Sequence, residues 1–199
     1  MNLALLVHQC APNAPVNLLQ ALIRTESGFN PLALHLNGPV RLRHPPTTAA
    51  QAGRWADWLI RAGYSVDMGL MQVNSTNLTA LNLTPLDLFD PCKNIRAGVT
   101  ILTASYTIAA RAHGSGSDSL LAALSAYNTG NFHDGFRNGY VVRVLSNAAP
   151  SPTPVAAGSL DSTCRLTHCS KPFAPQTIAP PERVGSAIAG FAGGDTRGP

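Results

Sequence analysis

A helical period of hydrophobic residues runs through residues 18–31 and predicts an amphipathic helix. The position one helical turn further along this period is Glu26, so a carboxyl group occupies a position where the pattern predicts a core residue. Gly28 and Pro31 follow closely and are typical of a helix end. Glu26 is therefore expected in the last turn of a helix whose buried face consists of Leu19, Leu22 and Ile23.

Further helical periods follow up to residue 148, separated by short breaks rich in glycine, proline or polar residues. Asn13 is a plausible N-cap for the first helix, with Pro15 in its first turn. Residues 31–48 and 64–74 are expected to be loops, because neither holds a sustained helical or strand period. The pattern thus predicts a single all-α domain over residues 1–148. The expected helices cover residues 13–26, 48–62, 75–81, 84–87, 94–113, 117–128 and 140–145.

The composition changes after Ala148. Residues 149–199 contain half of the 16 prolines, together with many small residues and few aromatic ones. Such a segment has too little hydrophobic surface to form a core. We expect a flexible tail there.

Glu26 has the setting of a general acid. Burial among hydrophobic residues and the negative end of the helix dipole both disfavour ionisation of a carboxyl group. A glutamic acid tuned in this way in another enzyme has a pKa of about 6. An alternative is a surface or structural residue that pairs with Arg24 or a backbone amide. The chain has only one other glutamate, Glu182 in the proline-rich segment, so glutamate chemistry in the helical domain must use Glu26.

Composition and charge narrow the possible partners. Charged residues make up 12% of the chain and the net charge is +4. Lys and Arg are scattered, with Arg41 and Arg43 as the densest pair, so no nucleic-acid partner is expected. No hydrophobic stretch is long enough for a transmembrane segment. The first ten residues lack a basic segment and a small-residue cleavage site, so no signal peptide is expected.

The four cysteines allow three disulfide pairings. Cys10 and Cys92 each stand just before an expected helix, whereas Cys164 and Cys169 share one short loop. We expect the disulfides Cys10–Cys92 and Cys164–Cys169, and hence an oxidising compartment. The alternative for the loop is a metal site that includes His168, but no fourth ligand is apparent. No metal or cofactor is expected.

Three separated stretches place hydrogen-bonding side chains where a helical core would hold hydrophobic ones. They are residues 26–27, 69–72 and 126–128. A cleft for a sugar polymer needs such amide and hydroxyl groups, together with aromatic or Met surfaces. A glycine at position 69 would let the backbone approach a ligand. Each stretch alone is a weak signal, because residues 69–72 are more often an ordinary turn and Tyr127 and Asn128 at a helix end are commonly a C-cap. Trp55 and Trp58 could be sugar platforms but are expected in the core.

The order and spacing of these motifs resemble the lysozyme-like lytic transglycosylases, the Slt family of glycoside hydrolase family 23. The wider pattern resembles the subgroup that accompanies type IV secretion and conjugation systems. The resemblance covers residues 9–146 and implies a lysozyme-like fold. The motifs are ESGFNP at 26–31, GLMQVN at 69–74, NIRAG at 94–98, AYN at 126–128 and the tyrosine that opens YVVRVL at 140.

The resemblance implies cleavage of the β-1,4 bond between N-acetylmuramic acid and N-acetylglucosamine in peptidoglycan. Glu26 would first protonate the leaving oxygen and then deprotonate the C6 hydroxyl of the same muramoyl unit, so that an anhydro ring forms. One carboxyl group then suffices, an exception to the usual acid pair. The location implied is the periplasm. The expected substrate-binding residues are Ser27, which orients Glu26, together with Gly69, Met71, Gln72, Tyr127, Asn128 and Tyr140, which stands near the acid.

Three other hypotheses stay open. The chain could be a hydrolytic muramidase, in which Asp67 holds the attacking water, unless Asp67 only caps the turn. It could also be a non-catalytic peptidoglycan-binding scaffold of a secretion machine, although an intact Glu26 argues against this. Finally, the tail could bind other components of a type IV secretion or conjugation system.

Overall fold

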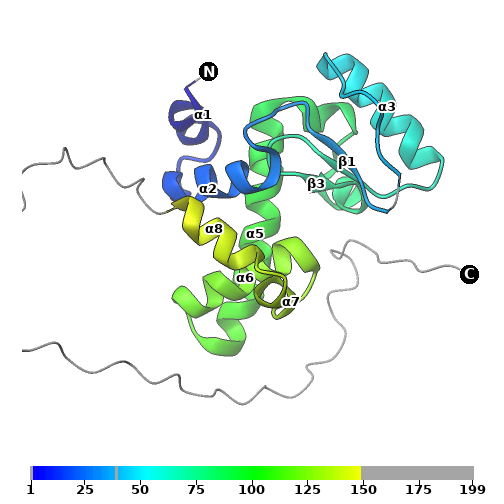
Figure 1. Cartoon of the computed structure of the whole chain (residues 1–199). Helices are drawn as coiled ribbons and strands as arrows, with labels where there is room; N and C mark the ends of the chain where they lie inside the picture. Colours follow the sequence, from blue (N-terminus) through cyan, green and yellow to red (C-terminus); the bar gives the residue numbers. More distant parts are fainter. Residues whose placement is uncertain (1, 39, 149–199) are drawn as a thin grey trace, which may run out of the picture. The chain divides into compact units, whose positions relative to one another are not determined.

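The computed structural model describes residues 2–38 and 40–148. These residues form a mostly helical domain with a small sheet (Figure 1). The helices are α1 (Leu3–Cys10), α2 (Val16–Ser27), α3 (Ala49–Arg61), α4 (Leu78–Leu81), α5 (Pro91–His113), α6 (Ser117–Thr129), α7 (Asp134–Arg137) and α8 (Tyr140–Ala148). The 3-10 turns are η1 (Ser75–Asn77) and η2 (Leu86–Phe89), and the strands are β1 (Leu34–Leu36), β2 (Val66–Met68) and β3 (Val73–Asn74).

Helix α5 is the centre of the helical part, and α6 and α1 pack against it (Figure 1). Its start is well defined by sequence, because the Asp90 side chain accepts a hydrogen bond of 2.8 Å from the Lys93 amide and Pro91 occupies the first turn. Helices α2 and α8 lie along each other. This pairing brings the end of α2 beside the start of α8, although the two are more than 110 residues apart in sequence.

The three strands form an antiparallel sheet in the order β1, β2, β3. His35 pairs with Asp67, and Asp67 pairs with Asn74. Because side chains alternate between the two faces of a strand, the buried Val66 and Met68 face the core while Asp67 faces the other way. The register therefore gathers His35, Asp67 and Asn74 on one face.

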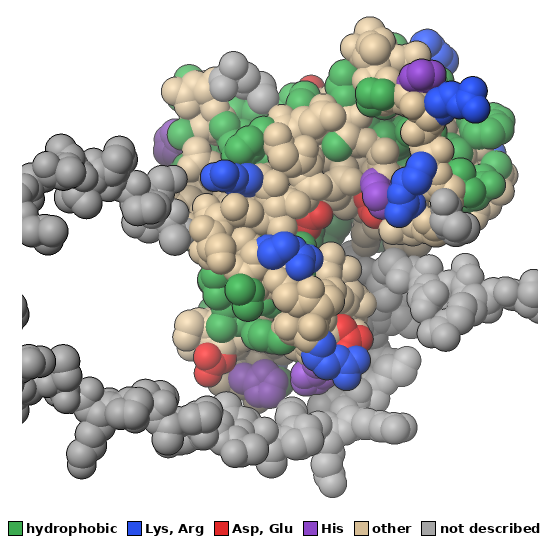
Figure 2. Space-filling view, viewed as in Figure 1, with side chains coloured by type: hydrophobic (Ala, Val, Ile, Leu, Met, Phe, Trp, Pro, Cys, Tyr) green, Lys and Arg blue, Asp and Glu red, His purple; other side chains and the backbone are tan. Residues whose placement is uncertain are grey.

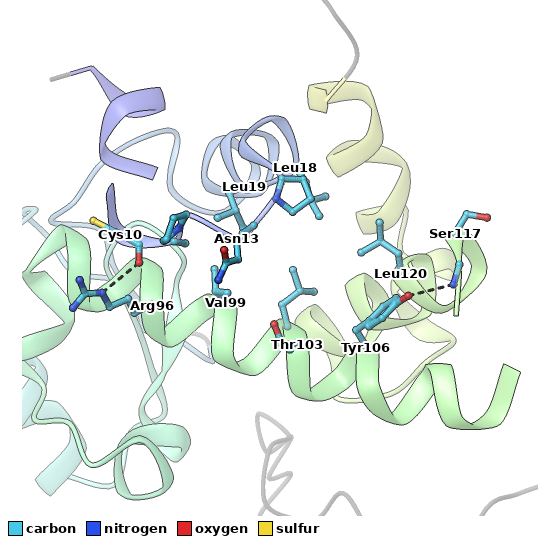
Figure 3. Close-up of a pocket in the computed structure, with 16 residues that line it drawn as sticks. Cys10, Asn13, Leu18, Leu19, Arg96, Val99, Thr103, Tyr106, Ser117 and Leu120 are labelled. Atoms are coloured by element: carbon cyan, nitrogen blue, oxygen red, sulfur yellow. Dashed lines mark hydrogen bonds between the residues drawn. The ribbon is translucent and has the colours of Figure 1, made fainter. Parts of the chain in front are cut away.

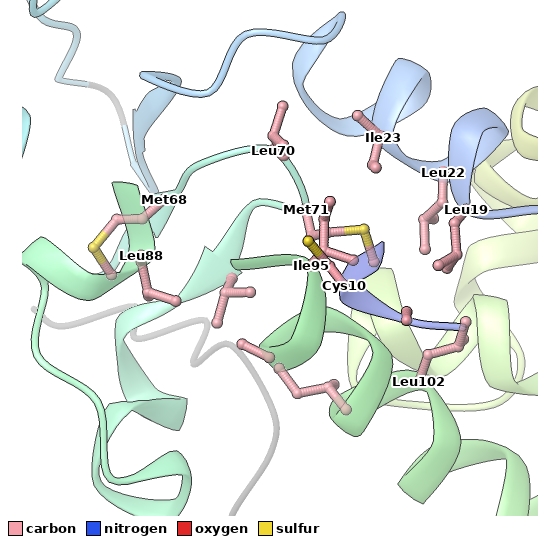
Figure 4. Packing of buried hydrophobic residues seen from close by; sticks show 14 of the residues in the cluster. Cys10, Leu19, Leu22, Ile23, Met68, Leu70, Met71, Leu88, Ile95 and Leu102 are labelled. Carbon is pink, nitrogen blue, oxygen red and sulfur yellow. The ribbon is translucent and has the colours of Figure 1, made fainter. Parts of the chain in front are cut away.

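The core lies between α2, the sheet region and α5 (Figure 4). Met71 and Ile95 occupy its middle and are fully buried. The other large side chains with almost no exposed surface include Leu19, Leu22, Ile23, Met68, Leu70, Leu88 and Leu124.

No described helix has the length and hydrophobicity needed to cross a bilayer.

The disulfide between Cys10 and Cys92 joins the end of α1 to the first turn of α5. It closes a loop across 82 positions of sequence, a length at which a cross-link strongly restricts the unfolded chain. This confirms the expected pairing. The expected pair Cys164–Cys169 lies outside the described residues, as does the tail at 149–199.

Several local expectations were wrong. Helix α1 was not anticipated, and the N-cap of α2 is Pro15 rather than Asn13. The segments expected as loops contain the three strands, which are only two or three residues long and exist through hydrogen bonds to distant segments. Trp58 is 67% exposed rather than part of the core.

Candidate functional site

Glu26 lies in the last turn of α2, as its position in the hydrophobic period predicts. Gly28 ends the helix in a left-handed conformation with φ 57°, which favours glycine. Its amide donates to the Arg24 carbonyl at 3.1 Å. The helix end thus presents a half-buried carboxyl group at the edge of the core.

Tyr140, the first residue of α8, is 2% exposed, and its hydroxyl donates a hydrogen bond to Glu26 Oε1. The guanidinium of Arg143 lies 5.9 Å from the centre of the Tyr140 ring. At the other end of α8, Asn147 Nδ2 donates to Thr25 Oγ1 at 2.9 Å. These contacts fix Glu26 against α8 while the buried α2–α8 interface keeps the phenol in place.

Burial raises the pKa of Glu26 from its ordinary value of 4.5 to about 7, because desolvation disfavours the carboxylate. The hydrogen bond from Tyr140 opposes this rise, and the nearby charges of Asp67 and Arg143 act in opposite directions. Burial also raises the pKa values of Tyr127 and Tyr140, so both phenols keep their protons. At neutral pH a large fraction of Glu26 is therefore protonated and able to donate.

Two adjoining pockets meet at Glu26, with volumes of about 590 Å³ and about 370 Å³. Both are lined by Glu26, His35 and Gln72, so together they form a groove with Glu26 between its two halves. Figure 2 shows acidic side chains in a hollow between the sheet side of the domain and the α6–α8 side. The larger half is further lined by Thr25, Asn37, Asp67, Val73, Asn74, Asn77, Ile101, Tyr127, Asn128, Gly130 and Arg143.

Asp67 lines the larger half of the groove, where two side-chain amides hold its carboxyl group. Asn37 Nδ2 donates to Oδ2 at 2.9 Å, and Asn74 Nδ2 donates to Oδ1 at 2.6 Å. Burial raises the pKa of Asp67, whereas these two hydrogen bonds and the charge of His35 lower it. The groove thus contains a second carboxyl group whose orientation is fixed by its neighbours.

Gln72 lines both halves of the groove in a left-handed conformation with φ 46°. Its Nε2 donates to the carbonyl of Gly69 at 2.9 Å and to that of Ala33 at 3.3 Å. A left-handed conformation is uncommon for a residue other than glycine and is often found at functional sites. These contacts hold the amide nitrogen, and none of the described hydrogen bonds uses the amide oxygen.

Tyr127 and Asn128 come from the end of α6 and line the larger half of the groove. The Tyr127 hydroxyl donates to the Met71 carbonyl at 2.7 Å. Asn128 Oδ1 accepts from Asn138 Nδ2 at 2.9 Å. Each side chain is therefore held by a hydrogen bond in the half of the groove that Glu26 also lines.

Ser27 lines the smaller half of the groove, but its hydroxyl donates to the Ile23 carbonyl at 3.1 Å. No hydrogen bond joins it to Glu26 among the described contacts. The residue that contacts the acid directly is Tyr140. We therefore reassign the positioning of Glu26 from Ser27 to Tyr140.

Two expected substrate contacts are corrected by the structure. Met71 is 0% exposed, so its side chain belongs to the core and lines neither half of the groove. Gly69 also lines neither half, and a Cβ there would lie 2.2 Å from both Asn94 Nδ2 and the Leu88 carbonyl oxygen. Glycine is needed at this position for packing rather than for the approach of a ligand.

A third pocket of about 680 Å³ lies between the start of α2, α5 and α6 (Figure 3). Its wall is mostly hydrophobic and includes Leu18, Leu19 and Leu120. None of the ionisable groups around Glu26 lines it. A polar polymer therefore fits the groove at Glu26 better than this pocket.

The comparison with protein families decides the classification. The sequence model of one protein family, the transglycosylase SLT domain, matches residues 5–144, from α1 into α8. The chain belongs to the transglycosylase SLT domain family. No solved structure matches the chain significantly.

Curated relatives of this SLT-domain chain include three proteins named virB1. "Protein virB1" of Agrobacterium fabrum is 38% identical over 157 residues, which are 77% of this chain and 62% of the relative. "Type IV secretion system protein virB1" of Brucella suis is 36% identical over 157 residues, or 76% and 66%. "Protein virB1" of Rhizobium radiobacter is 40% identical over 152 residues, or 73% and 60%. The matched part of this chain thus covers less than two thirds of the length of each of these relatives.

The SLT domain also holds groove residues that sequence reasoning did not identify, namely His35, Asn37, Asn74 and Arg143. Knowledge of which residues pair between the strands would have identified His35 and Asn74, since both pair with Asp67. Arg143 follows Tyr140 by three positions on α8 and so lies on the same helix face. Among the described residues of the SLT domain, no cluster of three or more His, Cys, Asp or Glu side chains is arranged to hold a metal ion.

Proposed function

We propose that the chain is a peptidoglycan lytic transglycosylase that cleaves the β-1,4 bond between N-acetylmuramic acid and N-acetylglucosamine and leaves anhydromuramoyl ends. The observation that carries the proposal is a carboxyl group with a pKa of about 7 between the two halves of one groove. Membership of the transglycosylase SLT domain family supports it. A groove that continues on both sides of the acid suits the cleavage of a bond within a polymer chain.

In the proposed reaction, protonated Glu26 donates its proton to the glycosidic oxygen as the bond to the muramoyl C1 breaks. The resulting carboxylate then takes the proton of the C6 hydroxyl, whose oxygen attacks C1 to close the anhydro ring. The proton balance is complete, because Glu26 ends the cycle protonated and no water is consumed. Tyr140 holds the carboxyl group through both steps, since its hydroxyl donates to Glu26 Oε1. Gln72, Tyr127 and Asn128 are the proposed substrate contacts.

A hydrolytic muramidase is the second candidate, and Asp67 favours it. This carboxyl group lines the same half of the groove as Glu26, where it could orient a water molecule toward C1. The two candidates give different products from purified peptidoglycan. Mass analysis should find anhydromuramoyl ends, which are lighter by one water than the reducing ends that hydrolysis creates. Reducing ends as the main product would overturn the proposed transglycosylase.

Activity should fall as the pH rises through the pKa of Glu26. Only the protonated form can donate, so we expect kcat/KM to be about half its plateau near pH 7 and to fall about tenfold for each further pH unit. The basic limb of a pH profile for kcat/KM on soluble glycan fragments checks this. A profile that stays flat up to pH 9 would show that Glu26 is not the essential acid.

We further propose that the protein acts in the periplasm and opens the cell wall locally for a type IV secretion or conjugation apparatus. The names of the virB1 relatives and the Cys10–Cys92 disulfide support this. Other components of that apparatus are proposed partners of the tail at 149–199. Deletion of residues 150–199 should preserve glycan cleavage and reduce co-purification with envelope proteins. Unchanged co-purification would exclude the tail as the binding segment.

A further inference from the structure

The segment at 40–46 separates two pockets. On one side lies the smaller half of the groove, which reaches from Glu26 to Arg41 and Pro45. On the other side is a pocket of about 360 Å³ against α3. Leu42 lines both, so the two pockets adjoin at this residue. The second pocket is lined by Leu42, Arg43, His44, Trp55, Trp58 and Leu59.

The α3 pocket presents an unusual surface. Trp58 is 67% exposed, although a tryptophan with no ligand normally buries most of its ring. Arg43 and His44 beside it are also exposed. A hydrophobic patch rimmed by polar groups is typical of a binding site. A flat indole ring matches the C–H face of a pyranose, whose hydroxyls point outward to polar groups at the rim.

We propose that the α3 pocket binds a saccharide unit of the peptidoglycan strand at a distance from the bond that Glu26 cleaves. This rests on the proposed function. A linear glycan that fills the smaller half of the groove leaves it past Leu42 and meets the indole of Trp58 next. Arg43 lines the α3 pocket and forms no ion pair within residues 2–38 and 40–148, so it is the cation proposed to meet the carboxylates of the peptides attached to muramoyl units. Arg41 is instead engaged by its own segment, since its guanidinium donates to the Gly38 carbonyl at 2.7 Å and to the Val40 carbonyl at 3.1 Å.

Binding by Trp58 can be measured directly. The chain has two tryptophans, so a Trp55→Phe variant keeps an aromatic ring at position 55 and leaves Trp58 as the single indole. We expect its fluorescence to change on titration with long oligomers of N-acetylglucosamine and to change little with the disaccharide. The additional change Glu26→Gln prevents cleavage during the titration, so this readout does not depend on activity. No response to long oligomers would overturn the proposal.

The kinetic test compares substrates of different length. Trp58→Ala should raise KM for long glycan strands about tenfold, equivalent to about 1.4 kcal/mol, with kcat unchanged. Short fragments that fill only the groove at Glu26 should show no change. Arg54→Ala is the matched control, because Arg54 is exposed on the same helix and lines none of the pockets described above. Equal KM values for Trp58→Ala and the wild type on long strands would refute the distal subsite.

Two further outcomes have a definite meaning. If Trp58 fluorescence responds to free muramoyl peptides but not to the oligosaccharide, the pocket is a peptide site and the proposal is wrong. If the indole binds long oligosaccharides but the wild type cleaves no glycan, the distal subsite stands and the proposed enzymatic function fails. The two proposals are thus tested separately.

Discussion

Glu26→Gln is expected to lower the rate of peptidoglycan cleavage by about 10² to 10⁴-fold, the range for loss of a general acid. Gln keeps the shape of the side chain and can still accept from the Tyr140 hydroxyl, but it has no proton to donate to the leaving oxygen. Clearance of a turbid peptidoglycan suspension measures the rate. Binding of glycan should be retained, because the other groove residues are unchanged and Gln keeps the shape of the side chain. Equal clearance by variant and wild type would refute catalysis and favour the non-catalytic scaffold.

Asp67→Asn is the matched comparison, since it makes the same chemical change in the same groove. A transglycosylase in which Glu26 performs both proton transfers should lose less than about tenfold in this variant. A hydrolase that needs Asp67 to hold water should instead lose as much as in Glu26→Gln. The two variants together separate the candidate functions independently of product analysis.

Glu26→Gln should lower the activity but raise the stability of the folded protein above neutral pH. The pKa of Glu26 rises from 4.5 to about 7 on folding, so the folded state holds this proton more tightly than the unfolded state. The stability associated with the proton is fully present below pH 4.5 and is lost as the pH rises through about 7. Above that pH the wild type buries a carboxylate, and the variant should be more stable by up to about 3 kcal/mol. Urea unfolding at pH 4 and pH 8 measures this, and a variant less stable than the wild type at pH 8 would contradict it.

Gly69→Ala should destabilise the fold by about 3 to 5 kcal/mol, or prevent folding. The backbone has φ 74° there, which disfavours any residue with a Cβ. The added atom would also lie 2.2 Å from Asn94 Nδ2 and from the Leu88 carbonyl oxygen. Asn94 is 0% exposed and donates to the carbonyls of Met68 and Leu88 at 2.8 Å and 2.9 Å, so its displacement leaves buried polar groups without partners.

Gly63→Ala is the control for backbone conformation alone. Gly63 has φ 87°, and nothing lies within 4 Å of a Cβ placed there. It should lose only about 1 kcal/mol. The difference between the two variants in thermal or urea unfolding therefore measures the collision with Asn94. Similar losses for both variants would show that Asn94 can move at little cost.

Gly69 and Met71 also show why residue type alone misassigns a site. Both belong to a motif beside the groove, and both were expected to contact substrate. The side chain of Met71 instead packs into the core, where a Cβ on Gly98 would lie within 3 Å of it. Only the path of the chain between β2 and β3 decides that Gln72 faces the groove and Met71 does not. Trp58 is the reverse case, because a helical period cannot distinguish a core ring from one that projects beyond the edge of the core.

The sequence by itself determined α2, the carboxyl group at its end and the main helices, because helix period, capping residues and glycine stops act over a few neighbouring residues. It also indicated the Cys10–Cys92 disulfide. The tertiary structure alone decided which groups surround Glu26. Asp67 and His35 reach the groove through an antiparallel register, and the Tyr140 hydroxyl reaches Glu26 through packing of α8 on α2. These contacts depend on hydrogen bonds and packing between segments far apart in the chain, which no local pattern encodes.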